Sequence, residues 1–420
     1  MKLPLSSRTT LWWLVALLGF AAWVGMRGLN ADSFWLDEIW SVRQAHLASP
    51  LDVWNVIATQ DPWQAPGYYM LLSTWGEVAG WSEFAVRSLS LFAGLIGIAF
   101  TWRLARDLMS PQGALAAAVA LGASAYYLYF FHEARAYTFC VLLTPMMVWS
   151  YRRFALSGRW PFAFLLGVAM TGALYIHYFA ALTAVLLGVF HLSLGLRWLG
   201  NSRRWWLLTG IFALCALLFL PWLDVMLRGI AQAGTELGVR GANALTSEQM
   251  IRGSLFLFSN GSTALMMLAL IFAVRRTRRA VLTWAWCLGL TGVLLVINAL
   301  LGVILEIRYM LALWPVFALL VGMGLERLGQ NRLSVFGAFL GIWVAAGLWM
   351  SLSPEAAVAL RNPHWYLPWR EWHAVLQDRA GDEDLTLVML PDWTWAVYHE
   401  GGLSYYLDSL PGEAALVARP

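Results

Sequence analysis

The chain alternates long apolar runs with short polar segments over most of its length. A helix needs about 20 mostly apolar residues to cross the hydrocarbon core of a bilayer. Eleven runs approach that length: Leu11–Met26, Phe84–Leu104, Ala114–Phe131, Ala136–Trp149, Trp160–Tyr178, Phe179–Leu196, Trp205–Leu223, Gly253–Val274, Ala280–Leu305, Tyr309–Leu325 and Leu333–Leu352. The pattern therefore predicts an α-helical protein that crosses a membrane about eleven times.

The composition agrees with this interpretation and excludes several other classes of protein. Hydrophobic residues make up 60% of the chain and charged residues 12%, whereas a soluble protein carries about 25% charged residues. Apart from Lys2, every basic residue is an arginine, and most lie in short loops, where they act as topology signals. We therefore expect no nucleic-acid partner. The three cysteines lie inside apolar runs without CxxC spacing, so they predict neither a disulfide framework nor a zinc site.

The distribution of arginines sets the expected topology. Lys2 and Arg8 precede the first apolar run, which ends without a small-x-small cleavage site, so we interpret it as an uncleaved helix with a cytoplasmic N-terminus. The apolar segment Pro66–Val78 is short and interrupted by glycines. If it does not cross, most arginines fall on the cytoplasmic side, with Asp107 and Glu326 as the only acidic residues there. We therefore expect this segment to lie at, or dip into, the outer face.

This topology divides the chain into two predicted domains. Residues 1–353 form a transmembrane domain with two long outer loops, 27–83 and 224–252. Residues 354–420 form a small extracytoplasmic α/β appendage, with a helix at Trp369–Arg379 and strands at Leu385–Leu390 and Ala414–Val417.

Two adjacent carboxylates, Asp37 and Glu38, are the first candidate for chemistry. They lie between Trp35 and Trp40, just beyond the first apolar run. Acidic groups at a membrane are functional candidates, because they are costly to remove from water. Adjacent residues of a helix point about 100° apart, so the pair cannot form a symmetric dyad. One carboxylate can act as a base while the other orients it or faces a cation.

Further polar groups are predicted at the same outer face. They are His132, Glu133 and Arg135 between two spans, Arg308 and Tyr309 at the start of another, His177 and Tyr178 at a helix end, and Gln64, Tyr68 and Tyr69 in the first outer loop. Each also has a purely structural interpretation. Tyr68 and Tyr69 can anchor the interface, His177–Tyr178 can be a satisfied interfacial pair, and Arg308 can extend to lipid headgroups or hold a phosphate through its planar fork.

Together these residues describe an outward-facing cavity with carboxylates and arginines and an apolar route for a lipid. That set suits a reaction with a general base and a stabilised anionic leaving group. The sequence contains no phosphate-binding loop, HExxH or nucleotide fingerprint. A lipid-borne donor is therefore the natural alternative to a nucleotide.

The same residues resemble those of the membrane-embedded C-type (GT-C) glycosyltransferases, specifically glycosyltransferase family 39, which includes relatives of the protein O-mannosyltransferases and the aminoarabinose transferase of lipid A. The resemblance covers most of Leu11–Leu325. It rests on Leu36-Asp37-Glu38, Pro66-Gly-Tyr68-Tyr69, Arg87, Glu133-Ala-Arg135-Ala-Tyr137, and Arg308-Tyr309 before Pro315.

The resemblance implies a polyprenyl-phosphate sugar donor, a hydroxyl acceptor, and transfer at the periplasmic face of a bacterial inner membrane. By match, Asp37 would be the base and Glu133 a second acid, while Arg135 and Arg308 would face the donor phosphate. Gln64-Ala65 departs from the family pattern, which puts contacts from that loop in doubt. Participation of a divalent cation, Mg²⁺ or Mn²⁺, on Asp37 and Glu133 stays open.

Two other functions remain as alternatives. A lipid-carrier transporter or flippase would place its charges at mid-membrane on broken, repeated helices, and no repeat is visible. A polysaccharide polymerase or ligase would rely on arginine and histidine in a large outer loop, and loop 224–252 contains no histidine.

Overall fold

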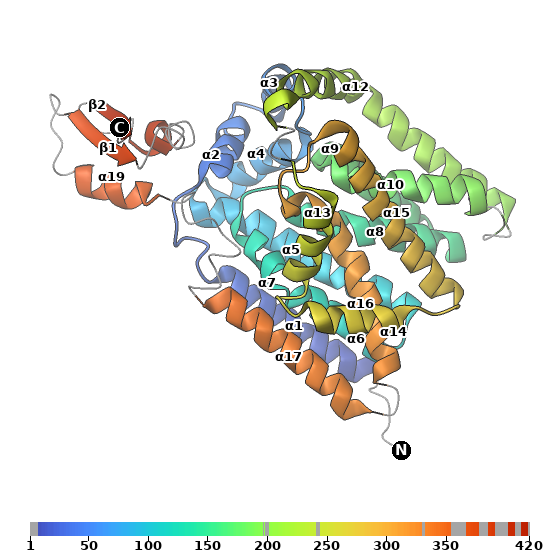
Figure 1. The fold of residues 1–420 in the computed structure, drawn as a ribbon. Coiled ribbons are helices and arrows are strands. Elements are labelled where there is room, and N and C mark those ends of the chain that lie inside the picture. Colours follow the sequence, from blue (N-terminus) through green and yellow to red (C-terminus); the bar gives the residue numbers. More distant parts are fainter. Residues whose placement is uncertain are drawn as a thin grey trace.

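The computed structural model describes residues 7–195, 197, 201–240, 244–329, 332–353, 367–377, 385–390, 402–407 and 413–418. Helices dominate this part of the chain (Figure 1). Within it, seven helices are long and apolar enough to cross a membrane, or up to nine if each of two bent pairs is one span. The seven spans contain α1 (Ser7–Met26), α5 (Glu83–Leu108), α10 (Tyr178–Phe190) with η2 (His191–Gly195), α12 (Ser202–Arg240), α15 (Arg278–Leu301), η4 (Ile307–Leu313) with α16 (Trp314–Leu328), and α17 (Leu333–Leu352).

The predicted number of eleven spans is therefore too high by this measure, although the predicted runs lie largely on helices. The difference comes from α8 (Tyr137–Ser157) and α9 (Trp160–Ile176). Helix α9 has 17 residues, which extend roughly 25 Å, less than the hydrocarbon core of about 30 Å. Helix α8 carries Arg152 and Arg153 near its end.

Two spans are broken, and one side chain joins the two breaks. Helix α6 (Pro111–Gly122) bends by 54° into α7 (Ala125–Tyr129) and η1 (Phe130–His132), and α13 (Ser247–Phe258) bends by 97° into α14 (Thr263–Ala273). Asn260, at the second break, has a positive φ of 54°. Its buried amide accepts from the backbone N–H of Ala125 and donates to the carbonyl of Ala123, both at 2.8 Å. It therefore satisfies backbone groups that the first break leaves without helical partners.

Helix α16 lies at the centre of the bundle, and 89% of the apolar part of the span Ile307–Leu328 is buried. Glycine allows its neighbours to approach closely. A side chain at Gly324 would collide with the carbonyl of Ala269 on α14, and one at Gly322 would collide with that of Gly113 on α6.

The segment predicted as the first outer loop forms three short helices, α2 (Leu36–Ala45), α3 (Pro50–Gln60) and α4 (Gly67–Ala79). Helix α4 corresponds to the apolar segment predicted not to cross. Its 13 residues extend roughly 20 Å, too short for a span.

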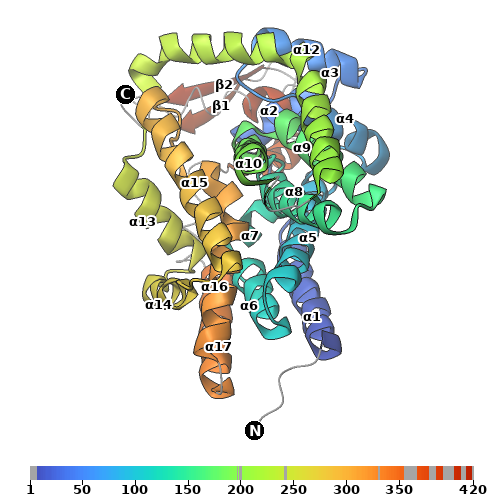
Figure 2. The same cartoon turned by 90° about the vertical axis from the view of Figure 1, so that its right-hand side faces the viewer.

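The segment predicted as the second outer loop, 224–252, is largely helical. Helix α12 continues to Arg240, and α13 begins at Ser247. Pro221 is the last proline of this helix, and Asp224 and Arg228 then form an i,i+4 ion pair at 3.0 Å that favours the helix. The second part of α12 crosses the end of the bundle that carries α3 (Figure 2). A side chain at Gly229 would collide with the backbone of Pro62 and Trp63, so α12 covers this loop directly.

The loops rich in arginine lie together at the end of the bundle opposite α3. Asp107 lies 3.1 Å from Arg153 and 4.0 Å from Arg103, and Glu326 lies 3.8 Å from Arg275. The two acidic residues that the sequence assigned to the N-terminal side therefore lie among its arginines.

The described part of the tail contains α19 (Trp369–Gln377), β1 (Leu385–Leu390) and β2 (Glu413–Ala418). The strands pair in parallel, with Leu385 opposite Glu413 at one end and Leu390 opposite Ala418 at the other. Residues Asp378 and Arg379 of the predicted helix lie outside the described residues. The tail contacts the first outer loop through Tyr406, whose hydroxyl accepts from the backbone N–H of Phe34 and donates to Glu83, each at 2.8 Å.

Candidate functional site

Asp37 lies between two arginines that come from distant parts of the chain. Its Oδ2 is 3.5 Å from Nη2 of Arg308 and 3.9 Å from Nη2 of Arg135. The Asp37 side chain is 26% exposed, whereas that of Arg308 is 9% exposed. The structure therefore brings together three residues that the sequence proposed for one site, and it leaves the carboxylate partly accessible.

Local structure explains the position of Asp37. Helix α2 begins after Trp35, which is extended, so Asp37 and Glu38 occupy the first turn. Carboxylates are favourable there because they face the positive end of the helix dipole. Arg135 follows the break after η1 and donates from Nη1 to the Asp37 carbonyl at 3.2 Å and to the Ser41 hydroxyl at 3.0 Å. These bonds fix the Arg135 guanidinium beside helix α2.

Glu38 faces away from this space and is fully buried. Its carboxylate forms a bidentate pair with Arg87 of α5, with N–O distances of 2.8 and 2.7 Å, and accepts the backbone N–H of Ala134 at 2.8 Å. Arg87 also donates to the carbonyls of Leu29 and Asp32. The Glu38–Arg87 pair thus joins the first loop, α5 and the loop before α8, and Glu38 has no open face toward a substrate.

Arg308 lies in an aromatic enclosure. Its guanidinium carbon is 5.3 Å from the ring centre of Trp35, 5.6 Å from Tyr137 and 5.8 Å from Tyr309. Glu306 lies 3.2 Å from its Nε, and burial raises the pKa of Glu306 while Arg308 lowers it. A guanidinium with little water around it interacts strongly with an anion.

Glu133 is a second acid beside this group, and it is buried. Its carboxylate oxygens make no conventional hydrogen bond within the described part of the chain. Burial raises the pKa of Glu133 to about 7, although Arg308 and the Tyr129 hydroxyl lower it. Glu133 therefore changes protonation near neutral pH.

A hydrogen-bonded chain extends from Arg135 to the first outer loop. Arg135 donates to the Tyr69 hydroxyl at 3.3 Å, and this hydroxyl donates to the Gln64 side chain. The backbone carbonyl of Gln64 accepts from the Tyr178 hydroxyl at 3.3 Å. This hydroxyl in turn accepts from the indole N–H of Trp222 at 2.8 Å. Gln64, Tyr69 and Tyr178 thus lie behind the arginine and hold it.

Three other predicted residues make packing or capping contacts. Tyr68 is fully buried against Phe139 and Tyr69, as expected of a packing residue. His132 lies against the backbone of Val24, Gly25 and Arg27 at the end of α1. His177 caps α10 by accepting from the Phe179 N–H at 3.3 Å. Burial, with Arg135 second, lowers the pKa of His177 to about 4, so this ring is neutral.

The residues here do not form a good divalent-cation site. The described part of the chain contains no group of three or more His, Cys, Asp or Glu side chains that could hold a metal ion. Asp37 instead faces two guanidinium groups, which would repel a dication.

The sequence interpretation did not include four residues that shape the site among its candidate site residues. They are Arg87, Glu306, Trp35 and Tyr137. Arg87 had a signal, since an arginine inside an apolar helix needs a buried partner. Trp35 and Tyr137 had none beyond their adjacency to charged residues.

Part of the chain is similar to a known protein family. The family described as dolichyl-phosphate-mannose-protein mannosyltransferase matches residues 63–223. No curated protein matches the chain by sequence.

Solved structures share the fold. ArnT from Cupriavidus metallidurans bound to undecaprenyl phosphate has a TM-score of 0.58 and 14% identity, and the match covers 96% of this chain and 85% of ArnT. ArnT in the apo state has a TM-score of 0.56 and 17% identity, and the match covers 87% of this chain and 68% of ArnT. The archaeal oligosaccharyltransferase AglB from Archaeoglobus fulgidus, in complex with an inhibitory peptide and a dolichol-phosphate, has a TM-score of 0.50 and 12% identity, with 93% of this chain and 63% of AglB covered. The chain is therefore similar to the dolichyl-phosphate-mannose-protein mannosyltransferase family over residues 63–223, and its fold is similar to those of ArnT and AglB.

Proposed function

We propose that this protein transfers a sugar from a polyprenyl-phosphate-linked donor to a hydroxyl group of a lipid, glycan or protein, at the extracytoplasmic face. The observation that carries the proposal is Asp37, a partly exposed carboxylate within 4 Å of two guanidinium groups. The structure of ArnT with undecaprenyl phosphate supports the donor class, because it shows the same fold with such a lipid.

In this proposal the arginines hold the donor phosphate. Arg308 is almost excluded from water, and Arg135 is fixed by Ser41 and Tyr69. Negative charge grows on the phosphate as the sugar–oxygen bond breaks. Donors already in position stabilise that charge without reorganising.

Asp37 is the proposed general base. The acceptor hydroxyl oxygen bonds to the anomeric carbon, the bond from that carbon to the phosphate oxygen breaks, and the hydroxyl proton passes to Asp37. Without donor, Asp37 faces both arginines. A phosphate that binds the arginines takes over these contacts and leaves the carboxylate available for the proton.

The other residues have supporting roles in this proposal. Glu38 positions α2 through Arg87, and the hydrogen-bonded chain of Gln64, Tyr69 and Tyr178 positions Arg135. Glu133 lies near Arg308 and is the proposed second acid of the site. Residues 1–353 form the catalytic domain, and the extracytoplasmic appendage 354–420 braces the first outer loop through Tyr406.

Sidedness has its own test. Single cysteines in place of Glu77, on α4, or Thr277, in the arginine-rich loop, are introduced into a chain whose native cysteines are alanine. We expect an impermeant thiol reagent to label the first in intact cells and the second only after lysis. The reverse result would put the site in the cytoplasm.

The activity is tested by mass spectrometry of glycolipids and glycans from cells that contain the protein, lack it, or contain Asp37→Asn. We expect a sugar-modified product only with the wild-type chain, and unmodified acceptor in the other two strains. Identical profiles in all three would refute the proposal.

A further inference from the structure

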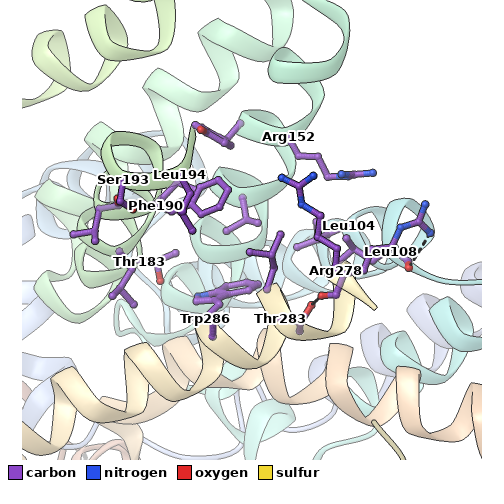
Figure 3. A pocket seen from close by; sticks show the side chains of 18 of the residues that line it. Leu104, Leu108, Arg152, Thr183, Phe190, Ser193, Leu194, Arg278, Thr283 and Trp286 are labelled. Carbon is purple, nitrogen blue, oxygen red and sulfur yellow. Dashed lines mark hydrogen bonds between the residues drawn. The ribbon is translucent and has the colours of Figure 1, made fainter. Parts of the chain in front are cut away.

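A cavity lies at the arginine-rich end of the bundle. It has a volume of about 660 Å³ and lies between α5, α8, α10 and α15. Its walls are mostly apolar, with Leu104, Leu186, Phe190 and Trp286 among them (Figure 3). Its volume is within the range of sites that bind small molecules, about 300–1,000 Å³.

This cavity is separate from the candidate active site. Helix α8 contributes Tyr137 to the site at its first residue and Arg152 to the cavity near its last turn. Fifteen helical residues extend roughly 22 Å. The two places therefore lie near opposite ends of the spans.

Three arginines line one side of the cavity: Arg152, Arg278 and Arg279. Figure 3 shows Arg152 and Arg278 on the side of Leu104 and Leu108, and Phe190 and Ser193 on the other. Arg152 donates to the carbonyl of Asp107 at 3.2 Å, and Arg279 to that of Leu108, also at 3.2 Å.

The acidic group beside Arg152 is Asp107, and its charge is shared with other arginines. The Asp107 carboxylate pairs with Arg103 and Arg153, and its contact to Arg152 is through the backbone. The Nε of Arg152 is buried and makes no hydrogen bond within the described part of the chain. The rim of the cavity is therefore strongly positive.

The cavity opens sideways onto an apolar surface. Val189 and Leu194 line it and are 59% and 49% exposed, on a segment that qualifies as a membrane span. The exposed face of such a helix contacts lipid chains. A molecule that enters through this opening therefore comes from the bilayer.

We propose that this cavity binds an anionic glycerophospholipid of the adjacent leaflet. The lipid phosphate contacts Arg152, Arg278 and Arg279, and an acyl chain fills the apolar part between α10 and α15. Basic pockets between spans bind anionic headgroups in this way. A single arginine at a helix end extends to headgroups without any pocket, but here three arginines line one apolar cavity. A free phosphate would leave that cavity unfilled.

The test uses the full-length purified protein, stripped of lipid in detergent and titrated with phosphatidylglycerol, phosphatidylcholine or inorganic phosphate. Binding is followed by native mass spectrometry and by the melting temperature. We expect one tightly held phosphatidylglycerol that raises the melting temperature, and no comparable effect of phosphatidylcholine or phosphate. An equal effect of phosphate or of phosphatidylcholine would overturn the proposal.

Two variants locate the lipid. Arg278→Ala/Arg279→Ala should weaken phosphatidylglycerol binding at least tenfold, whereas Arg276→Ala/Arg332→Ala removes the same charge from the same end outside the cavity and should have little effect. Ser193→Trp retains all the arginines but fills the cavity, and it should also abolish the tight binding. Equal losses in both double variants, or tight binding by Ser193→Trp, would show general attraction to a basic surface and refute the cavity as the site.

Discussion

The carboxylate of Asp37 lies 3.5 Å from the guanidinium of Arg308, whereas the carboxylate of its neighbour Glu38 is closed by Arg87 at 2.7 Å. One residue of an acidic pair therefore faces the candidate site, and the other holds the scaffold together.

This division of roles predicts different defects for two isosteric substitutions. Asp37→Asn keeps the volume but cannot accept a proton, so sugar transfer should fall by about 10²-fold or more while the melting temperature stays near wild type. Glu38→Gln leaves the charge of Arg87 buried without its counter-ion, which typically costs about 3–5 kcal/mol. It should therefore lower the melting temperature strongly. A stable but inactive Glu38→Gln protein would instead assign the base to residue 38.

Arg308 should be irreplaceable by another cation. Lysine keeps the charge but loses the planar fork and its stacking on Trp35 and Tyr137. We expect Arg308→Lys to lose much of the activity and Arg308→Ala nearly all, measured as transfer from donor lipid. Arg228→Ala is the control, because Arg228 forms an exposed pair with Asp224 and should be neutral. Normal turnover by Arg308→Ala would place the phosphate elsewhere.

The protonation of Glu133 predicts a pH dependence of stability. Burial raises its pKa to about 7 in the folded chain, from an ordinary value of 4.5. The folded state therefore holds the proton more tightly, and this contribution is full below about pH 4.5 and is lost as pH rises through about 7. The melting temperature should fall over that interval in the wild type and less in Glu133→Gln. Parallel profiles for the two proteins would contradict a titrating Glu133.

Asn260 should stabilise both broken spans. Asn260→Ala leaves the Ala125 N–H and the Ala123 carbonyl without this partner, and each buried unsatisfied group costs about 1–3 kcal/mol. We expect a clear loss in melting temperature, whereas the exposed control Asn55→Ala should have no effect. Asn260→Gly relieves the positive φ of 54° but not the lost hydrogen bonds, so it should remain destabilised.

Tyr406 tests the role of the tail. Tyr406→Phe removes one hydroxyl that bridges Phe34 and Glu83. Hydrogen exchange of residues 30–38 should become faster, and transfer should fall with it. Tyr405→Phe keeps its ring contact with Phe34 and serves as the control. Unchanged exchange in Tyr406→Phe would separate the tail from the active site.

The sequence alone determined the membrane class, the approximate positions of the helices and most of the charged residues of the site. Apolar runs and arginine loops carry this information because each reflects transfer of a local segment between water and lipid. The apolar pattern did not show that the polar residues after Leu223 continue a helix, which covers Pro62 and Trp63.

Only the tertiary structure decided which carboxylate is open and which is closed. Asp37 and Glu38 have the same sequence surroundings, but partners from three other segments, Arg87, Arg135 and Arg308, choose between them. The tertiary structure also places His132 beside α1 and forms the cavity between α5, α8, α10 and α15. Such pairings depend on how distant helices pack, because a side chain's direction is fixed only once its helix has neighbours.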